Sequence, residues 1–302
     1  HTQNNNSCAN PPVNVEPGTA STIMGYAGIC APNVQNNSDD YFNSANLQEI
    51  GAYITTGAGG CPTPQNLTNN APTITTGSAS YTIPASTPFA LTAISTDLDT
   101  ADVLTFTWEQ QDNQTSTQPP IPTATGGPNF RSLDPSTNPT RYFPNLTDLT
   151  AGVSPTWEVL SSVSRTMNFR GVVRDNSAGA GCNEHVDVTV TVAASAGPFV
   201  LNYPSATGIS WIGTTTQTVT WNVANTDVAP VNSPTVDIFL SIDGGMTYPT
   251  QVATNVANDG SQQIVVPNTA STTCRIMVKS NNGLFFDISD NNFEITSATF
   301  GY

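Results

Sequence analysis

Basic residues are scarce in this chain. Its 302 residues include seven lysines and arginines against 22 aspartates and glutamates, which gives a formal net charge of −15. Lys279 is the only lysine, and no arginine precedes Arg131. A surface of this sign repels polyanions, so the composition argues against nucleic acid as a partner. A merely soluble acidic surface explains the same charge equally well.

Long apolar runs are also missing. No stretch is apolar enough to span a membrane, and no charged n-region precedes an apolar h-region. The chain does not begin with Met, so we expect residue 1 to be a cut rather than a natural start. What remains is rich in Asn, Thr, Ser, Gly and Pro around short apolar runs, which is typical of extracellular all-β modules. We therefore expect a secreted or cell-surface protein.

Cysteine is limited to five residues, and none has the C-x-x-C spacing of a zinc or redox site. They are Cys8, Cys30, Cys61, Cys182 and Cys274. Cysteines of a secreted chain tend to pair, and an odd count leaves one over. We expect one disulfide among the first three, with its two members left open. Cys182 and Cys274 are expected to be unpaired or locally buried.

Period-two alternation of apolar residues dominates two long segments, 73–194 and 199–296. It is clearest over residues 104–108 and 186–192 in the first segment and 236–242 in the second. Such alternation predicts half-buried strands, and turn signals at short spacing favour a sandwich. We predict a mainly β protein with two antiparallel β-sandwich domains of the immunoglobulin-like or fibronectin-III-like kind.

The two predicted sandwiches differ in their connections. The first contains a Pro-rich insertion, residues 119–144, which is unusual for a compact sandwich. It either folds over onto a neighbouring domain or has no role, and the sequence favours neither. A short linker ending at Pro198 predicts an end-to-end arrangement with limited freedom. Trp108 and Trp221 lie on alternating strands and should be core residues, one in each sandwich.

Residues 1–64 form a third domain without strand signals. A helix is predicted over residues 46–55, with Asn46 as N-cap and Glu49 completing a capping box. Leu47, Ile50 and Ile54 give it an apolar stripe. A piece of this size cannot bury much of a core alone. We expect it to dock on the following domain, to need a missing part, or to be poorly ordered.

The stretch STIMGYAGIC, residues 21–30, carries a family resemblance. Met24-Gly25-Tyr26 resembles the Met-turn of the metzincin zinc endopeptidases, which follows the zinc motif H-E-x-x-H-x-x-G-x-x-H. With SDDYF and a short helix after it, residues 1–64 resemble the end of a bacterial reprolysin-like catalytic domain. They would be the remnant of its lower subdomain: a loop, a Met-turn and one helix. The strings SIDGGMTYP and VPNTASTTCRIMVKS are similar to modules that follow such domains before a type IX secretion tail.

This resemblance implies roles for three residues. His1 would be the third zinc ligand of the parent enzyme, Met24 an apolar floor beneath the metal, and Tyr26 a donor to the oxyanion. The alternatives are an ordinary terminal His, a core Met and a core aromatic. The base that activates the zinc-bound water would lie in the missing N-terminal catalytic part, so the present chain should be inactive. Glu184-His185 lacks a following His and is expected to start a strand.

Asp97, Asp99 and Asp102 cluster just before a predicted strand, and Asp175 at a second turn could join them in space. Oxygen-rich loops of this type suit calcium, which takes six to eight oxygen ligands. The alternative is a solvated turn, because Asp is a common turn residue. Asp39-Asp40 is a weaker candidate of the same kind.

Two functions therefore compete. The first is the C-terminal portion of a secreted zinc metalloendopeptidase that hydrolyses peptide bonds of a protein substrate. The second is a cell-surface binding or adhesion module built from the β-sandwiches. Both could hold for one parent chain, and the sequence immediately before His1 would discriminate between them.

Overall fold

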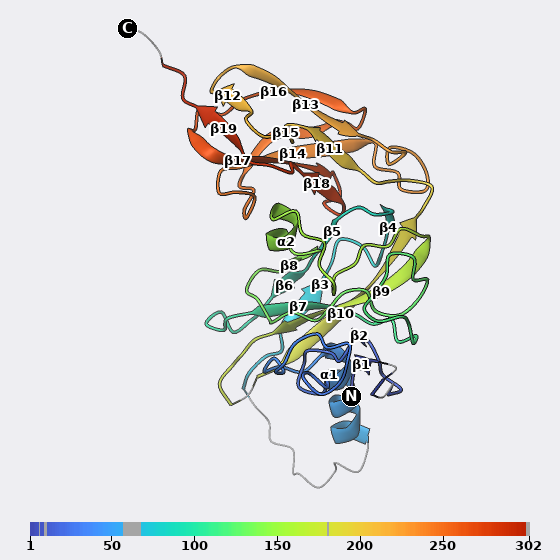
Figure 1. The fold of residues 1–302 in the computed structure, drawn as a ribbon. Coiled ribbons are helices and arrows are strands. Elements are labelled where there is room, and N and C mark those ends of the chain that lie inside the picture. The colour runs from blue at the N-terminus through green and yellow to red at the C-terminus, as the bar shows by residue number, and fades with distance from the viewer. Residues whose placement is uncertain (6, 9–10, 57–67, 180, 300–302) are drawn as a thin grey trace.

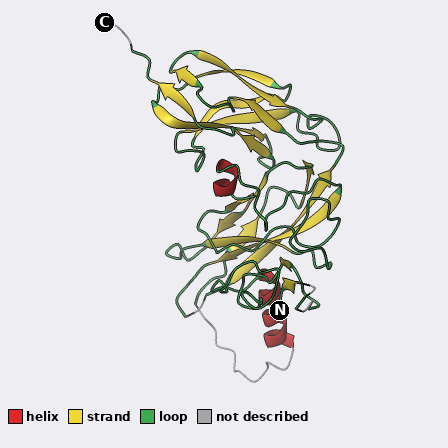
Figure 2. Cartoon of the chain, in the orientation of Figure 1, coloured by secondary structure: helices red, strands yellow, loops and turns green. Residues whose placement is uncertain are grey.

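The computed structural model describes residues 1–5, 7–8, 11–56, 68–179 and 181–299. Figure 1 shows an N-terminal segment, a middle β-sandwich and a C-terminal β-sandwich following one another along one long axis. The protein is mainly β with little helix (Figure 2).

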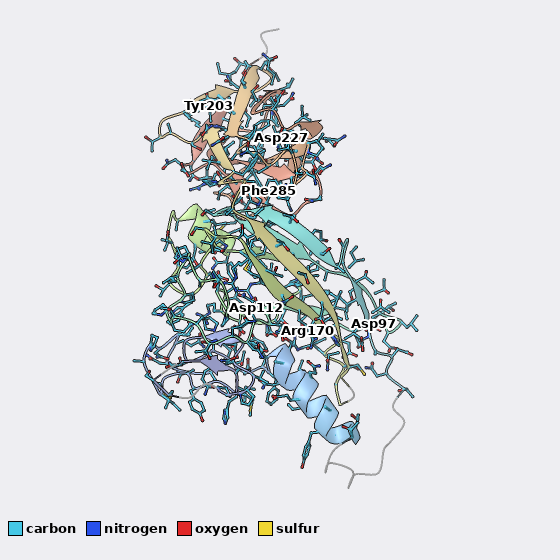
Figure 3. All side chains as sticks on the ribbon, turned by 90° about the vertical axis from the view of Figure 1, so that its right-hand side faces the viewer. Asp97, Asp112, Arg170, Tyr203, Asp227 and Phe285 are labelled. Atoms are coloured by element: carbon cyan, nitrogen blue, oxygen red, sulfur yellow. A yellow bond between two sulfur atoms is a disulfide. The ribbon has the colours of Figure 1, made fainter. Side chains whose placement is uncertain are left out.

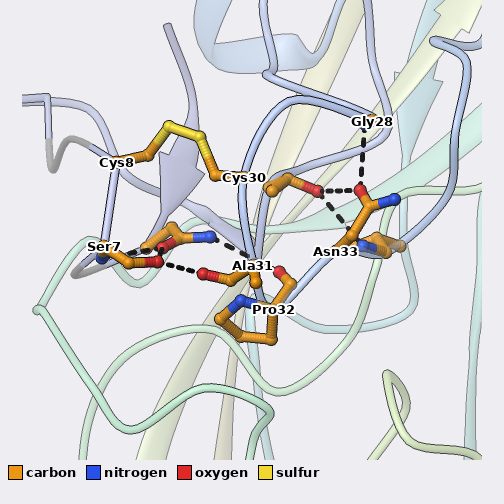
Figure 4. The surroundings of a disulfide bond; sticks show 10 residues. Ser7, Cys8, Gly28, Cys30, Ala31, Pro32 and Asn33 are labelled. Atoms are coloured by element: carbon orange, nitrogen blue, oxygen red, sulfur yellow. Dashed lines mark hydrogen bonds between the residues drawn. A yellow bond between two sulfur atoms is a disulfide. The ribbon is translucent and has the colours of Figure 1, made fainter.

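The N-terminal segment is mostly loop. Its regular elements are β1 (Gln3–Asn4), β2 (Glu16–Pro17) and α1 (Ser44–Thr56). β1 and β2 pair in parallel. A disulfide joins Cys8 to Cys30, which confirms a pair among the first three cysteines, whereas Cys61 lies outside the described residues. Beside the bridge, Ser7 Oγ donates to the carbonyl of Ala31 (Figure 4).

Helix α1 begins earlier than predicted, because Asn43 caps it. The Asn43 side chain accepts from the backbone N–H of Ala45 at 2.9 Å, and its carbonyl accepts from Leu47 N–H at 3.1 Å. Asn46 therefore lies in the first turn, where its amide donates to Glu49 at 3.2 Å. The prediction of Asn46 as N-cap was wrong, since a side chain with the same capping chemistry precedes it.

The apolar stripe of α1 does not face a core. Only Ser44, Ala45 and Asn46 are buried in this helix. Ile50 is 38% exposed and Ile54 is 56% exposed. The helix docks through its N-terminal end, and most of the predicted apolar stripe remains exposed.

The middle sandwich contains eight strands and one short helix. They are β3 (Thr73–Thr75), β4 (Ser80–Pro84), β5 (Phe89–Thr92), β6 (Ile94–Thr96), β7 (Thr105–Gln110), β8 (Thr140–Phe143), α2 (Leu146–Thr150), β9 (Arg165–Arg174) and β10 (Asn183–Ala193). One sheet has the order β4-β10-β9-β7, and the strand pairs β3-β6 and β5-β8 complete the sandwich.

The C-terminal sandwich contains nine strands. They are β11 (Val200–Tyr203), β12 (Ser210–Ile212), β13 (Thr216–Asn222), β14 (Thr235–Ser241), β15 (Thr250–Ala257), β16 (Ser261–Val265), β17 (Ser271–Ser280), β18 (Phe286–Ile288) and β19 (Phe293–Thr296). Its sheets have the orders β11-β13-β16 and β12-β19-β17-β14-β15, and β18 also pairs with β17.

Both sandwiches have the strand order of immunoglobulin-like and fibronectin-III-like modules. In each, the first two strands go to opposite sheets, so that β4 and β12 lie beside the last strands, β10 and β19. These two pairs are parallel. The expectation of purely antiparallel sandwiches was therefore wrong, because a strand that crosses to the second sheet runs in the same direction as the last strand.

The two sandwiches share a continuous apolar core. Trp108 and Trp221 are both buried, one in each sandwich, as predicted. The contact between the sandwiches runs through the chain around β18, where Ala90 N–H donates to Leu284 O at 2.7 Å and Phe286 N–H to Pro88 O at 3.0 Å. The sandwiches are therefore docked end to end through backbone hydrogen bonds as well as through the linker.

The Pro-rich segment is folded over onto the N-terminal segment. Ser132 O accepts from Ser21 Oγ at 3.3 Å, and Ser132 Oγ accepts from Asn43 Nδ2 at 3.2 Å. Gln118, just before the segment, accepts from Gly18 N–H at 3.0 Å. The last residues of the predicted insertion form β8, so only its earlier part lies outside the sandwich sheets. Of the two alternatives for this insertion, the structure supports the packing role.

Candidate functional site

Three of the four predicted calcium ligands lie together. Asp97 and Asp102 are in the loop after β6, and Asp175 directly follows β9. These loops meet at the end of the middle sandwich away from the C-terminal sandwich, where Figure 3 labels Asp97. One carboxylate oxygen from each residue lies within 4.8 Å of the others. The sequence separation of 73 between Asp102 and Asp175 is closed by the sandwich topology.

Asp175 is the buried, ionised member of the cluster. It is 0% exposed, and its oxygens accept from Cys182 N–H at 2.9 and 3.0 Å and from Asn69 Nδ2 at 2.6 Å. Ser177 N–H donates to it at 3.1 Å. Burial alone would raise the pKa of Asp175, but these hydrogen bonds outweigh it and the pKa is lowered.

Asp97 and Asp102 supply the unsatisfied oxygens. Each has an Oδ2 atom that is buried and has no hydrogen-bond partner. Desolvation raises the pKa of Asp102, and the negative charges of Asp175, Asp97 and Asp99 raise it further, whereas a side-chain hydrogen bond from Ser177 lowers it in part. Buried polar atoms without a partner are rare in native proteins, and a bound ion is one way to satisfy them. Carboxylate oxygens converging in this way fit a hard divalent cation such as calcium.

Asp99 is placed differently from the prediction. Its Oδ2 accepts from Asn70 N–H at 2.6 Å and Asn70 Nδ2 at 3.1 Å. It therefore ties the chain that leaves the N-terminal segment to the loop after β6. Asn69 and Asn70 were missed by sequence reasoning, although two asparagines before Ala71-Pro72 are a turn signal that could have pointed to them.

The weaker acidic candidate does not join this cluster. Asp39 accepts from Gln35 Nε2 at 2.7 Å and lies 3.9 Å from Arg131 Nη2. Within the described part of the chain, the only group of three close metal-binding side chains is that of Asp97, Asp102 and Asp175.

The three residues implied by the metzincin resemblance lie side by side. His1 Nδ1 is 3.1 Å from Met24 O, and the His1 ring meets the Tyr26 ring edge-on with centroids 4.9 Å apart. The turn is closed by Gly25 N–H donating to Thr22 O at 2.9 Å. A Cβ on Gly25 would lie 2.6 Å from the Ala20 side chain, so the turn requires glycine here.

Zinc does not fit the residues at this turn. A catalytic zinc site has three protein ligands and one open position. In the described ranges, His1 is the only imidazole near Met24, because the other histidine, His185, lies in β10. We therefore derive no zinc-assisted step. Glu184-His185 starts a strand, as predicted.

Comparisons with known proteins identify solved structures of similar fold but do not assign the chain to a family. No family model and no curated protein matches the chain. Among solved structures, the fibronectin(III)-like modules of Clostridium thermocellum CbhA are 11% identical over 76% of this chain and 98% of theirs, with a TM-score of 0.25. The Ig1-2 module of the Drosophila receptor protein tyrosine phosphatase DLAR is 11% identical over 76% of this chain and 100% of its own, with a TM-score of 0.35. Drosophila N-cadherin EC1-4 is 10% identical over 76% of this chain and 50% of its own, with a TM-score of 0.26.

These likenesses are too low to carry a functional argument. The modules are immunoglobulin-like and fibronectin-III-like by their own strand order, described above. Together with the Cys8–Cys30 disulfide, they are consistent with an extracellular protein. In the ranges that the structure describes, no helix has both the length and the apolar character needed to cross a membrane.

Proposed function

We propose that this chain is an extracellular binding or adhesion portion of a protein, stiffened by calcium bound at Asp97, Asp102 and Asp175. The observation that carries the proposal is the pair of buried Oδ2 atoms of Asp97 and Asp102, which have no hydrogen-bond donor beside an ionised Asp175. Calcium would neutralise their repulsion and satisfy both oxygens.

The position of the cluster gives the cation a mechanical role. Asn69 bonds to Asp175, and Asn70 bonds to Asp99, so the chain entering the middle sandwich is attached to both loops. A cation that fixes these loops also fixes the entry of the chain. At the opposite end, backbone bonds hold the C-terminal sandwich. A rod stiff at both joints suits a module that presents surfaces to a partner at a defined distance.

Calorimetric titration of the 302-residue chain with CaCl2 tests this proposal, with MgCl2 as the comparison ion. We expect calcium binding and a higher melting temperature in calcium than in chelator. A ligand at 100 times its Kd adds about 2.7 kcal/mol of stability. Asp102→Asn should abolish the shift, whereas Asp227→Asn, at an exposed carboxylate of the C-terminal sandwich, should leave it intact. No heat of binding and equal melting in calcium and chelator would reject the site.

A second candidate function is the C-terminal portion of a secreted zinc metalloendopeptidase. The juxtaposition of His1, Met24 and Tyr26 favours it. On this proposal, a preceding catalytic part supplies the base and the other two histidines, binds the peptide substrate, and is exported with this chain by the type IX pathway. Reading the gene upstream of His1 tests it: a H-E-x-x-H-x-x-G-x-x ending there supports the proposal, and any other sequence removes it.

A further inference from the structure

A pocket of about 350 Å³ opens at the junction of the two sandwiches. Its walls come from four places: β7 and β8 of the middle sandwich, the start of α2, the chain around Leu133 and Asp134, and the loop after β14 that carries Met246 and Tyr248. Pockets at domain junctions with apolar walls and few polar groups are the usual form of a binding site.

The pocket exists because the middle sandwich lacks one edge strand. In the C-terminal sandwich, β14 is bordered by β15. Among the described residues, the corresponding strand β7 has no regular strand on its outer side, and the chain beside it forms one isolated bridge, between Phe106 and Ser136. A hollow remains where a strand would lie, and the C-terminal sandwich closes one side of it.

The walls combine polar with apolar side chains, and part of the apolar surface is held in place. Met246 is 48% exposed, and the rings of Tyr142 and Tyr248 line the same space. Tyr142 is fixed edge-on against Phe286 at 5.3 Å between centroids. The Tyr248 hydroxyl is buried close to Gly245. A preformed apolar surface of this kind loses little entropy when it binds a ligand.

The lining carries one basic and one acidic side chain, Arg141 and Asp134. Arg141 is neutralised by Glu158 at 2.6 Å and donates to Arg131 O at 2.6 Å. Asp134 is the other charged side chain in the lining, and no described residue makes a hydrogen bond or ion pair with it. Partial desolvation raises the pKa of Asp134, and the carboxylates of Asp39 and Asp40 raise it further, whereas the positive charge of Arg131 lowers it in part. The region therefore has an excess of negative charge that a cation would relieve.

We infer that this pocket receives a basic side chain, lysine or arginine, from a partner polypeptide. The aliphatic stem lies along Met246 and the two tyrosine rings, and the charged head reaches Asp134. The rings add cation–π attraction, and the acidic surface of the chain repels anionic partners. The inference rests on the proposed binding function and names the chemistry of its partner.

Methyl-labelled Met246 gives a direct readout. We would titrate the full chain with acetyl-Gly-Gly-Lys-Gly-Gly-amide, with the same peptide carrying neutral norleucine or acidic glutamate, and with butylamine. The lysine peptide should shift the Met246 methyl signal, and more salt should weaken its binding. The norleucine peptide should bind several-fold more weakly, and the glutamate peptide should not bind.

Two exposed variants keep the test independent of folding. Asp134→Asn should weaken the lysine peptide about threefold to fivefold, as expected for one partly solvated ion pair, whereas Asp227→Asn should not change its affinity. Equal binding of the lysine and norleucine peptides, or an unaffected Asp134→Asn, would overturn the inference. So would binding of butylamine without the peptide, which would make this a small-molecule site. No methyl shift at about 10 mM peptide, where a millimolar site would be mostly filled, would also overturn it.

Repeating the titration in chelator separates this inference from the calcium proposal. The acidic cluster lies at the other end of the middle sandwich (Figure 3). Peptide binding that persists without any calcium effect would therefore reject the calcium site alone. A calcium effect without peptide binding would reject only the pocket.

Discussion

The two sandwiches share one strand order but join what precedes them by different chemistry. In the middle sandwich, the loop after β9 carries Asp175, which accepts a hydrogen bond from Asn69 in the incoming chain. In the C-terminal sandwich, the loop after β17 carries Leu284 and leads into Phe286, the first residue of β18, and these two residues bond to Ala90 and Pro88 of the preceding sandwich. One joint is acidic and fits a cation, whereas the other is apolar and buried. The same topological position thus serves two kinds of joint.

The edges differ as well. β14 alternates buried and partly exposed residues over most of its length. β7 is buried on both faces from Phe106 onward, because the N-terminal segment covers its polar side. On that side, Glu109 is 1% exposed and accepts from Ser44 N–H at 2.6 Å. A carboxylate at the first turn of α1 complements the helix dipole. The N-terminal segment therefore completes the middle sandwich.

Phe285→Ala should have the largest effect, because it breaks the apolar joint. Phe285 is 0% exposed, pairs with Phe89 through an isolated β-bridge, and packs its ring 5.3 Å from that of Phe199 (Figure 3). Truncating a buried phenylalanine costs about 3–5 kcal/mol. Urea unfolding followed by tryptophan fluorescence would measure the loss. A cost below about 1 kcal/mol would show that the joint is not part of the cooperative core.

Glu109→Ala should weaken the attachment of the N-terminal segment. Ser44 N–H would lose its acceptor and the nearby Arg174 a favourable charge. Loss of a buried charge-assisted hydrogen bond costs about 1.5–3 kcal/mol. Glu49→Ala, at an exposed glutamate of the same helix, is the matched control and should cost less than about 0.5 kcal/mol. Limited proteolysis would locate the damage, and cleavage equal in both variants would contradict it.

Asp287 should make the apolar joint sensitive to pH. Burial raises the pKa of Asp287 to about 7, and the hydrogen bond from Leu201 N–H at 2.6 Å offsets this only in part. The folded chain therefore holds a proton that the unfolded chain releases near pH 4. Stability from this group is complete below about pH 4 and falls as the pH rises toward 7, by up to about 1.4 kcal/mol per pH unit.

Asp287→Asn should remove that fall and leave the variant more stable than the parent at pH 8. Urea unfolding at four pH values between 5 and 8 would measure both slopes. Parallel curves for the parent and the variant would show that Asp287 does not titrate in this window.

Asp102→Asn in chelator should have the smallest effect on stability, and the direction of the change in melting temperature tests the charge argument. Desolvation and neighbouring carboxylates raise the pKa of Asp102, so its ionised form destabilises the folded chain without a cation. The variant should melt slightly higher than the parent in chelator at pH 7 and lower than the parent in calcium. Thermal melting in both buffers would show this crossing, and a variant that melts lower in both would reject the charge argument.

The sequence alone determined the features that depend on nearby residues. Alternation over residues 104–108 and 236–242 predicted strands, because side chains of a strand point to opposite faces every second residue. The same local patterns predicted little helix, the sandwich fold and a disulfide among the first three cysteines. The sequence also grouped Asp97, Asp99 and Asp102 as candidate calcium ligands, with Asp175 as a residue that could join them in space.

Only the tertiary structure decided the features that depend on distant contacts. Asn43 caps α1, and Glu109 accepts a hydrogen bond from the backbone N–H of Ser44 in the first turn of the helix. The helix therefore docks by its N-terminal end, and most of its apolar stripe stays exposed. Asp99 is not part of the cluster, because its carboxylate accepts a hydrogen bond from the backbone N–H of Asn70, 29 residues earlier in the chain. β4 pairs in parallel with β10, and β12 pairs in parallel with β19. These pairs and the pocket beside β7 depend on which strands meet when the sheets form. Local sequence carries no signal for these partners, because each is brought into contact only when the sheets close.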